Sequence, residues 1–330
     1  MIRHKSEAFT TNHDVLRHCR LLVADGIFID IYLSPLSQDI LPDLYLRKIL
    51  VVMKFKNANV LITGGASGIG KIMGRMALEK GAKCFIIWDI NLSGIEATRK
   101  ELSKYGKVKG YIVDVADDDI VKVAYQKTVA DCGNIDILIN CAGIITSNKT
   151  FDKQTHEEIM KTMNINTLAP MFVTRAMLPD MLERNVGHVC TIASAGGMLS
   201  NPKMSVYAAS KWGVIGWSDS VRIELQEMKS NVHFTTVAPY YINTGMFDGV
   251  KSRIIPILKP DYVAMKVIRA IEKNISFKGI PFGFHFIRFW QAILPTRVFD
   301  FFFGQVFGIY HTMDQFTGRK SGKEAMGKAS

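Results

Sequence analysis

The sequence predicts an α/β fold in which helices cover both faces of a doubly wound parallel sheet, in three layers (α/β/α) and a single domain. Six short apolar runs alternate with longer stretches of helical periodicity, and a glycine-rich turn follows the first run. The runs lie at residues 60–62, 84–88, 111–113, 137–139, 188–192 and 232–238. Short buried strands that alternate with helices form β-α units, so this order predicts a parallel sheet with helices on both sides.

Composition and charge narrow the class of protein. The five cysteines are odd in number and scattered, without a C-x-x-C pair, which predicts reduced thiols in a cytoplasmic protein and argues against a disulfide framework or a metal site. Residues 251–330 carry thirteen Lys and Arg against five Asp and Glu, so 8 of the net charge of +11 lie there. No recognition motif accompanies these basic residues, so nucleic acid is not expected as a partner.

Residues 1–52 are predicted to form a poorly ordered N-terminal extension. We expect no signal peptide, because Asp14, Arg17, Arg20 and Asp25 interrupt the apolar residues. Met53 opens a segment that would make a natural protein start directly before the first strand. We therefore hypothesise that the extension is dispensable, and loss of soluble, active protein on its deletion would refute this.

The turn after the first strand has the sequence TGGASGIG, at residues 63–70. Glycines at these positions permit a tight turn and let the backbone approach a pyrophosphate, whose charge is met by amides at the start of the next helix. The turn therefore predicts a dinucleotide site. Its candidate cofactor-binding residues are Gly64, Ser67, Gly68, Ile69 and Gly70.

Asp89 ends the second predicted strand, nineteen residues after Gly70. An acidic side chain there would bind the ribose hydroxyls of the cofactor and repel a 2′-phosphate, which favours NAD over NADP. The alternative is that Asp89 only caps the next helix or stabilises a turn.

Two further strand ends and one helix carry polar candidates. Asp114 and Val115 follow the third strand, and Asn140, Ala142 and Gly143 follow the fourth. Ligands of such folds bind outside the carboxyl ends of the strands, so these residues are expected to flank the adenosine half of a dinucleotide. Residues 152–183 are predicted to form one long helix that contains Asn164 and Asn166. A buried asparagine in a helix needs a hydrogen-bonding partner, so at least one of the two should have a polar role.

Ser194, Tyr207 and Lys211 are the candidate catalytic group. Tyr207 and Lys211 lie four residues apart, so both project from one face of a predicted helix. Ser194 lies thirteen residues before Tyr207, directly after a predicted strand. A nearby ammonium stabilises a phenolate and lowers the pKa of the phenol from its ordinary value of about 10. The alternative is a half-buried aromatic residue beside a solvated lysine.

With these residues in place, the chain resembles the short-chain dehydrogenase/reductase family over about residues 57–275. The match consists of T-G-x-x-x-G-I-G at 63–70, N-x-A-G at 140–143, the serine at 194 and Y-x-x-x-K at 207–211. The resemblance implies a Rossmann-type domain with a built-in catalytic site, here residues 53–276. It also implies an NAD(P)-dependent oxidoreductase that acts on CH–OH groups.

The resemblance assigns a role to each matching position. Tyr207 would be the general acid and base, Lys211 would bind the nicotinamide ribose and lower the pKa of the phenol, and Ser194 would hydrogen-bond the substrate oxygen. The family's helix asparagine, which holds a water in the proton relay, falls on Asn166. Tyr207 and Lys211 would also contact the cofactor.

The loop after the sixth strand matches the family in part. Thr244 corresponds to the threonine that bonds the nicotinamide carboxamide, and Pro239 and Ile242 are further candidate cofactor contacts. The family's P-G pair is here Pro239-Tyr240. This departure leaves the local backbone path and the shape of the substrate pocket open.

Residues 277–330 are predicted to form an aromatic, basic tail. Residues 277–310 hold ten of the nineteen phenylalanines, but Arg288, Pro295 and Arg297 interrupt them, so they do not make a transmembrane helix. The tail could be a lid over a lipophilic pocket, a partner-facing surface, a segment lying on an anionic membrane, or ordinary core packing.

The tail, with Leu294-Pro295 and Gly318-Arg319, looks like the lipid-metabolising branch that includes retinol and hydroxysteroid dehydrogenases. This predicts a hydrophobic alcohol or ketone as substrate and a cytoplasmic protein with peripheral membrane contact through residues 277–310. The resemblance also implies a homodimer or homotetramer that associates through the helices around 152–183 and 203–228. The alternatives are a 3-oxoacyl thioester reductase and a non-catalytic NAD-binding sensor. The complete Ser194, Tyr207 and Lys211 set argues against the sensor.

Overall fold

The computed structural model describes residues 17–24, 27–33 and 55–318. The expected start at Met53, most of the N-terminal extension and residues 319–330 of the tail lie outside the described residues. Within residues 1–52, strand β1 (Arg17–Ala24) pairs antiparallel with β2 (Ile27–Leu33). The sequence analysis did not predict these two strands.

Residues 53–330 contain a parallel sheet of seven described strands in the order β5-β4-β3-β6-β7-β8-β9. The strand order reverses direction between β3 and β6, and ligands of doubly wound sheets bind at such a point, outside the carboxyl ends of the strands. The predicted fold class is confirmed. The strands are β3 (Asn59–Thr63), β4 (Cys84–Asp89), β5 (Val108–Ile112), β6 (Ile137–Asn140), β7 (Gly187–Ile192), β8 (Val232–Pro239) and β9 (Phe277–Ile280).

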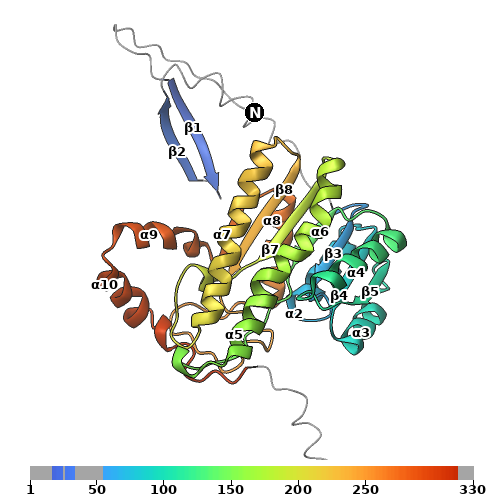
Figure 1. The fold of residues 1–330 in the computed structure, drawn as a ribbon. Coiled ribbons are helices and arrows are strands. Elements are labelled where there is room, and N and C mark those ends of the chain that lie inside the picture. Colours follow the sequence, from blue (N-terminus) through green and yellow to red (C-terminus); the bar gives the residue numbers. More distant parts are fainter. Residues whose placement is uncertain (1–16, 25–26, 34–54, 319–330) are drawn as a thin grey trace, which may run out of the picture. The chain divides into compact units, whose positions relative to one another are not determined.

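Helices flank the sheet on both faces (Figure 1). Successive residues of a strand point to opposite faces, so each strand contributes to two cores. In β3, Val60 and Ile62 pack into one core and Leu61 into the other, and all three are fully buried. One core is closed by α2 (Gly68–Glu79), α3 (Leu92–Leu102) and α8 (Pro260–Glu272), and the other by α4 (Asp118–Cys132) and α6 (Ala169–Glu183). The helix α7 (Ser205–Glu227) contributes its first half to the former core and its second half to the latter.

The seventh strand lies in the region that the sequence analysis assigned to the tail. β9 has the sequence FKGI and pairs with the last residues of β8, from Thr236 opposite Phe277 to Pro239 opposite Ile280. Its apolar pattern is too short and too interrupted to indicate a strand. Only the presence of β8 beside it supplies the hydrogen-bonding partner that makes it one.

The tail beyond β9 packs against the sheet core. It forms η5 (Phe282–Phe286), α9 (Ile287–Ile293), α10 (Thr296–Phe299), η6 (Asp300–Val306) and η7 (Ile309–His311). Phe284, Ile287, Phe299 and Ile309 are buried in the core that α2, α3 and α8 close. Within the described ranges, no helix combines the length and the apolar character that crossing a bilayer requires.

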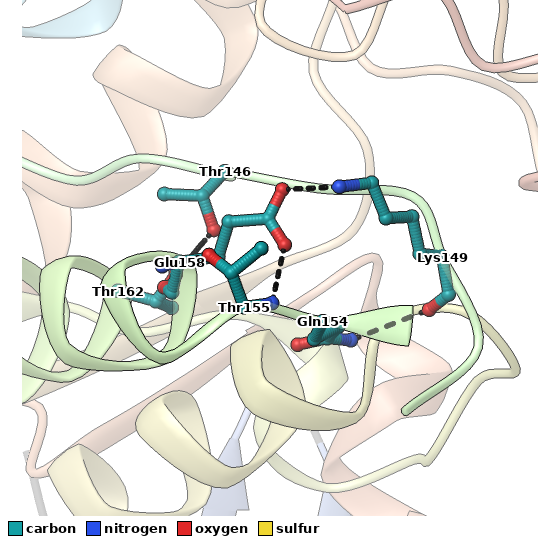
Figure 2. A network of polar contacts seen from close by, with 6 residues as sticks. All are labelled: Thr146, Lys149, Gln154, Thr155, Glu158 and Thr162. Carbon is teal, nitrogen blue, oxygen red and sulfur yellow. Dashed lines mark hydrogen bonds and ion pairs between the residues drawn. The ribbon is translucent and has the colours of Figure 1, made fainter. Parts of the chain in front are cut away.

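The helix predicted over residues 152–183 begins later than expected, because a capping box fixes its start at α5 (His156–Met163). The Glu158 amide donates to the Thr155 hydroxyl at 3.2 Å, and the Thr155 amide donates to the Glu158 carboxylate at 2.9 Å. Figure 2 shows this network, in which Lys149 pairs with Glu158 at 2.8 Å and Thr146 contacts the Thr162 hydroxyl at 2.7 Å. These contacts tie the loop after β6 to α5, close to the candidate site.

Candidate active site

The glycine-rich turn lies between the end of β3 and the start of α2. Gly64 and Gly68 have φ angles of +67° and +53°, which side chains with a Cβ rarely adopt. A Cβ on Gly70 would lie 2.3 Å from the Gly64 carbonyl oxygen, and a Cβ on Gly64 would lie 3.0 Å from the Ala142 backbone. The exposed Ser67 precedes α2 and its side chain makes no cap hydrogen bond, while Ile69 is buried. The glycines of the turn are therefore closely packed against backbone, whereas Ser67, directly before the start of α2, is exposed.

Asp89 is half-buried at the carboxyl end of β4 and holds the turn in place. Its carboxylate accepts hydrogen bonds from the Ala66 amide at 3.1 Å and from the Asn91 amide at 3.0 Å. The cap of α3 is Asn91, whose side chain accepts from Gly94. A carboxylate has about four acceptor positions, so Asp89 keeps capacity for ribose hydroxyls.

The loop after β6 is tied to the end of β3. The Thr63 hydroxyl accepts hydrogen bonds from the amides of Cys141 at 3.0 Å and Ala142 at 3.1 Å. Asn140 is buried and donates to the hydroxyls of Thr174 and Thr191, so its side chain points toward α6 and β7. The described hydrogen bonds of the Asn140 side chain therefore connect the end of β6 to α6 and β7.

Two other predicted cofactor residues follow β5. Val115 is buried, whereas Asp114 is exposed and accepts a hydrogen bond from the Ala116 amide at 3.0 Å. Both lie at the carboxyl edge of the sheet, as predicted, because β5 is parallel to β4.

Asn166 is fully buried in a π-helical turn, η3 (Asn164–Leu168), between α5 and α6. Its Oδ1 accepts from the Ile144 amide at 2.8 Å, and its Nδ2 donates to the Ile144 carbonyl at 2.9 Å and to the Ser210 hydroxyl at 3.2 Å. Single π-helical turns inside α-helices are frequent at functional sites. A Cβ on Gly143 would lie 3.4 Å from Asn166 Oδ1 and 3.6 Å from Lys211 Nζ, so the loop after β6 lies against both side chains.

The structure brings Ser194, Tyr207 and Lys211 together at the carboxyl end of β7 and the start of α7. A Cβ on Gly196 would lie 3.4 Å from the Tyr207 ring and 3.5 Å from Ser194 Oγ. Lys211 Nζ donates to the Ile192 carbonyl at 3.0 Å and lies 5.9 Å from the centroid of the Tyr207 ring. The side chains of Tyr207 and Lys211 are 7% and 5% exposed, so both ionisable groups are buried.

Burial controls the protonation of both groups. It raises the pKa of the Tyr207 phenol to about 12, and a hydrogen bond from Ser194 lowers it in part. Burial lowers the pKa of the Lys211 ammonium to about 8. The Lys211 ammonium donates to the Ile192 carbonyl, and that it lowers the pKa of the phenol stays a prediction.

The loop after β8 completes the site. A Cβ on Gly68 would lie 3.8 Å from Thr244, so this threonine lies beside the glycine-rich turn. Ile242 is buried and bridges to Leu258, and Pro239 ends β8 opposite Ile280. The Tyr240 amide donates to the Ile280 carbonyl at 2.8 Å, so the sequence departure at Tyr240 leaves the strand intact.

A small cavity lies beside Ser194 and Tyr207. The sequence analysis did not identify most of its walls, because their residues come from separate segments and no local motif marks them. Aromatic rings dominate: the Tyr207 ring lies 6.0 Å from Phe247, and Tyr240 lies 5.4 Å from Phe284 of the tail. The tail therefore contributes to the wall of the cavity. The lining residues missed include Leu199, Asn201, Met204, Tyr241, Phe247 and Ile309.

Comparisons with known proteins agree with this geometry. A family model described as short chain dehydrogenase matches residues 58–254. Epidermal retinol dehydrogenase 2 of Mus musculus is 31% identical over 268 residues, which cover 79% of this chain and 85% of the relative. Estradiol 17-beta-dehydrogenase 11 of Homo sapiens is 32% identical over 240 residues, which cover 72% of this chain and 79% of the relative.

A solved structure supports the fold independently. A short chain dehydrogenase/reductase from Burkholderia phymatum, crystallised in complex with NAD, superposes with a TM-score of 0.67 at 20% identity. The superposition covers 73% of this chain and 95% of that one. At this identity the likeness shows the shared fold.

Proposed function

The chain belongs to the short-chain dehydrogenase family, and from this premise we propose that Tyr207 is the general acid and base of an alcohol or ketone oxidoreductase. Members of the family are NAD(P)-dependent enzymes that act on CH–OH groups, so membership fixes the class of reaction. The observation that carries the assignment is the meeting of Ser194, Tyr207 and Lys211 beside a cavity that Ser194 and Tyr207 line.

The residues around the glycine-rich turn fit a dinucleotide. Gly64 and Gly70 pack so closely that a Cβ on either would meet backbone, and the first amides of α2 lie at an exposed residue without a side-chain cap. Helix N-termini of this kind bind phosphate. Thr244 and Lys211 would hold the nicotinamide half, since an ammonium bonded once to Ile192 has two further N–H donors.

When bound, NAD(P) supplies the hydride acceptor or donor and, in its oxidised form, a positive charge. Because burial raises its pKa to about 12, the Tyr207 phenol is protonated at neutral pH and can act as the acid in reduction. In oxidation its phenolate removes the proton of the alcohol. Ser194 donates a hydrogen bond to the substrate oxygen, and Asn166 positions the loop after β6 through Ile144.

We propose NAD as the preferred cofactor. The Asp89 carboxylate lies at the end of β4 beside the glycine-rich turn, and its bonds to Ala66 and Asn91 keep it there. A negative charge at this point favours ribose hydroxyls and repels a 2′-phosphate.

The walls of the cavity support a hydrophobic alcohol or ketone as substrate. They are mostly aromatic and aliphatic, and the tail closes part of them through Phe284 and Ile309. The relatives named for retinol and estradiol are in keeping with this proposal.

We also propose that the tail contacts a membrane surface. Phe286, Phe289, Trp290, Phe301 and Phe302 each expose 42–57% of their surface, although they belong to a packed segment. An apolar surface with nearby basic residues suits an anionic bilayer. Binding to vesicles that contain phosphatidylserine should weaken in Phe289→Ser and persist in Ile112→Ser, an equally exposed apolar residue on β5 at the far edge of the sheet. Equal binding of both variants would contradict the proposal.

The decisive experiment on the reaction is turnover by Tyr207→Phe. NADH formation would be followed with a panel of sterols, retinoids, long-chain alcohols and, in reverse, 3-oxoacyl thioesters. We expect turnover to fall by about 10² to 10⁴ with NADH binding retained, because general acid and base catalysis is lost. Tyr105→Phe, which removes a hydroxyl from an exposed residue, is the matched control. Activity of Tyr207→Phe within tenfold of the parent would disprove the assignment.

A further inference from the structure

We propose that Asn201 is a second polar anchor in the cavity and binds a hydroxyl group that the substrate carries away from its reacting carbon. The inference rests on the proposed function and narrows its substrate to a hydrophobic alcohol or ketone with an additional hydroxyl. Among the described residues that line the cavity, Asn201 carries the only side-chain amide. It belongs to the loop between η4 (Ala195–Gly197) and α7.

The hydrogen bonds around Asn201 fix the direction of its amide. The Thr312 hydroxyl donates to the Ile309 carbonyl at 2.9 Å, so its single hydrogen is committed. Thr312 must therefore accept the hydrogen bond from Asn201, which places Nδ2 rather than Oδ1 at the 2.8 Å contact. The same nitrogen lies 2.9 Å from the Tyr241 hydroxyl. Both hydrogens of the amide are thereby used.

The amide oxygen has no hydrogen-bonding partner in the part of the chain that the structure describes. The Tyr241 hydroxyl has its own acceptors in Thr312 at 3.1 Å and Met204 Sδ at 3.4 Å, so it leaves no donor for Asn201. Among the described polar atoms, Asn201 Oδ1 is buried without a hydrogen bond, in a residue that is only 9% exposed. Buried acceptors normally have a donor, and because Asn201 lines the cavity, a hydroxyl of the ligand is the donor that this proposal assigns to Oδ1.

Asn201 and the catalytic residues Ser194 and Tyr207 line the same cavity. The Phe247 ring lies 6.0 Å from the Tyr207 ring and 5.0 Å from the Tyr241 ring, and Tyr241 is bonded to Asn201. The Phe247 ring thus links the catalytic tyrosine to the tyrosine that holds the amide. A cavity lined in this way suits a molecule with an apolar body and a second polar group away from its reacting carbon.

The tail of the chain helps to build the anchor. Thr312 follows η7, and its side chain is buried against Tyr241 from the loop after β8. Three segments distant in the sequence thus hold one amide in one orientation. A preorganised polar group of this kind discriminates against ligands that lack the matching hydrogen-bonding group.

The test compares three secondary alcohols at each of several chain lengths, with full-length protein and NAD. The far end of the chain carries 2-hydroxyprop-2-yl, tert-butyl or 2-methoxyprop-2-yl, so the end groups have similar shape and none of them can be oxidised. At one chain length we expect kcat/KM to be about tenfold higher for the hydroxyl than for tert-butyl. The methyl ether should give no advantage, because it cannot donate to Asn201 Oδ1.

The variant Asn201→Leu should bring the hydroxyl to tert-butyl ratio to about one, and a ratio within one protein is insensitive to a general loss of activity. Asn148→Leu is the matched control, since Asn148 bonds the Met313 carbonyl of the same tail segment without lining the cavity. It should keep the preference.

The outcomes separate the two proposals. Equal kcat/KM for all three ends at every length in the parent protein, or a preference that survives in Asn201→Leu, would overturn the anchor and leave the oxidoreductase intact. If no alcohol is turned over, the proposed reaction fails, and calorimetric titration of the same compounds then tests the anchor. Equal Kd values for the hydroxyl and tert-butyl compounds in that titration would overturn it.

Discussion

Replacing Asn166 by alanine tests the structural account of the site most directly. Asn166 is fully buried and makes three hydrogen bonds, two of them to the amide and carbonyl of Ile144. In Asn166→Ala the Ser210 hydroxyl keeps its bond to the Tyr207 carbonyl, but both groups of Ile144 lose their partner. We therefore expect the variant to be less stable than the parent protein.

The size of the effect follows from these two groups. Ile144 is half-buried and both of its bonds to Asn166 are part-buried, so the loss of each costs about 0.5–1.5 kcal/mol, the net value of a typical hydrogen bond. The two together cost about 1–3 kcal/mol, of which the higher helix propensity of alanine returns less than about 1 kcal/mol. A net loss of about 1–2 kcal/mol is measurable against the stability of a typical domain, about 5–15 kcal/mol.

The measurement is urea unfolding followed by circular dichroism. Asn164→Ala is the control, because Asn164 belongs to the same π-helical turn but has no side-chain hydrogen bond among the described residues. We expect its free energy of unfolding to stay within about 0.5 kcal/mol of the parent value. If Asn166→Ala were as stable as Asn164→Ala, the reading of the Ile144 contacts would be wrong.

Three further predictions concern the cofactor site and the core. Asp89→Asn should lower the ratio of kcat/KM with NAD to kcat/KM with NADP by about tenfold, because it removes one negative charge near the ribose. Gly70→Ala should weaken NADH binding by about tenfold in a fluorescence titration, since its Cβ would lie 2.3 Å from the Gly64 carbonyl oxygen and displace the turn. In His188→Gln the free energy of unfolding should fall less between about pH 6.5 and about pH 4.5 than it does in the parent protein. Burial lowers the pKa of His188 to about 3, against about 6.5 in the unfolded chain. The unfolded chain therefore binds the extra proton first, and the stability that depends on neutral His188 is complete above about pH 6.5 and lost as the pH falls toward 3.

Each of these predictions has its own control. An unchanged cofactor ratio in Asp89→Asn would mean that Asp89 only holds the turn through Ala66 and Asn91. Gly216→Ala, where a Cβ would meet nothing within 4 Å, should leave NADH binding unaffected, and a similar loss in both glycine variants would contradict the argument from the turn. If the urea midpoint falls by the same amount between pH 6.5 and pH 4.5 in the parent and in His188→Gln, His188 is not a cause of the acid sensitivity.

The sequence by itself determined the fold class, six of the seven strands of the parallel sheet and the positions of the main motifs. These features depend on local patterns: apolar runs of strand length, glycines where the backbone needs positive φ, and a tyrosine and a lysine one helical turn apart. Ser194, Tyr207 and Lys211 could therefore be placed near one another from the sequence.

Only the tertiary structure decided the features that depend on which distant segments meet. β9 is a strand because β8 lies beside it, and Asn166 rather than Asn164 is buried because only Asn166 faces Ile144 and Ser210. Asn201 has no local signal at all, since its environment comes from Tyr241 and Thr312. The protonation of Tyr207 and Lys211 is likewise set by burial, a property of the whole fold that neighbouring residues in the sequence do not reveal.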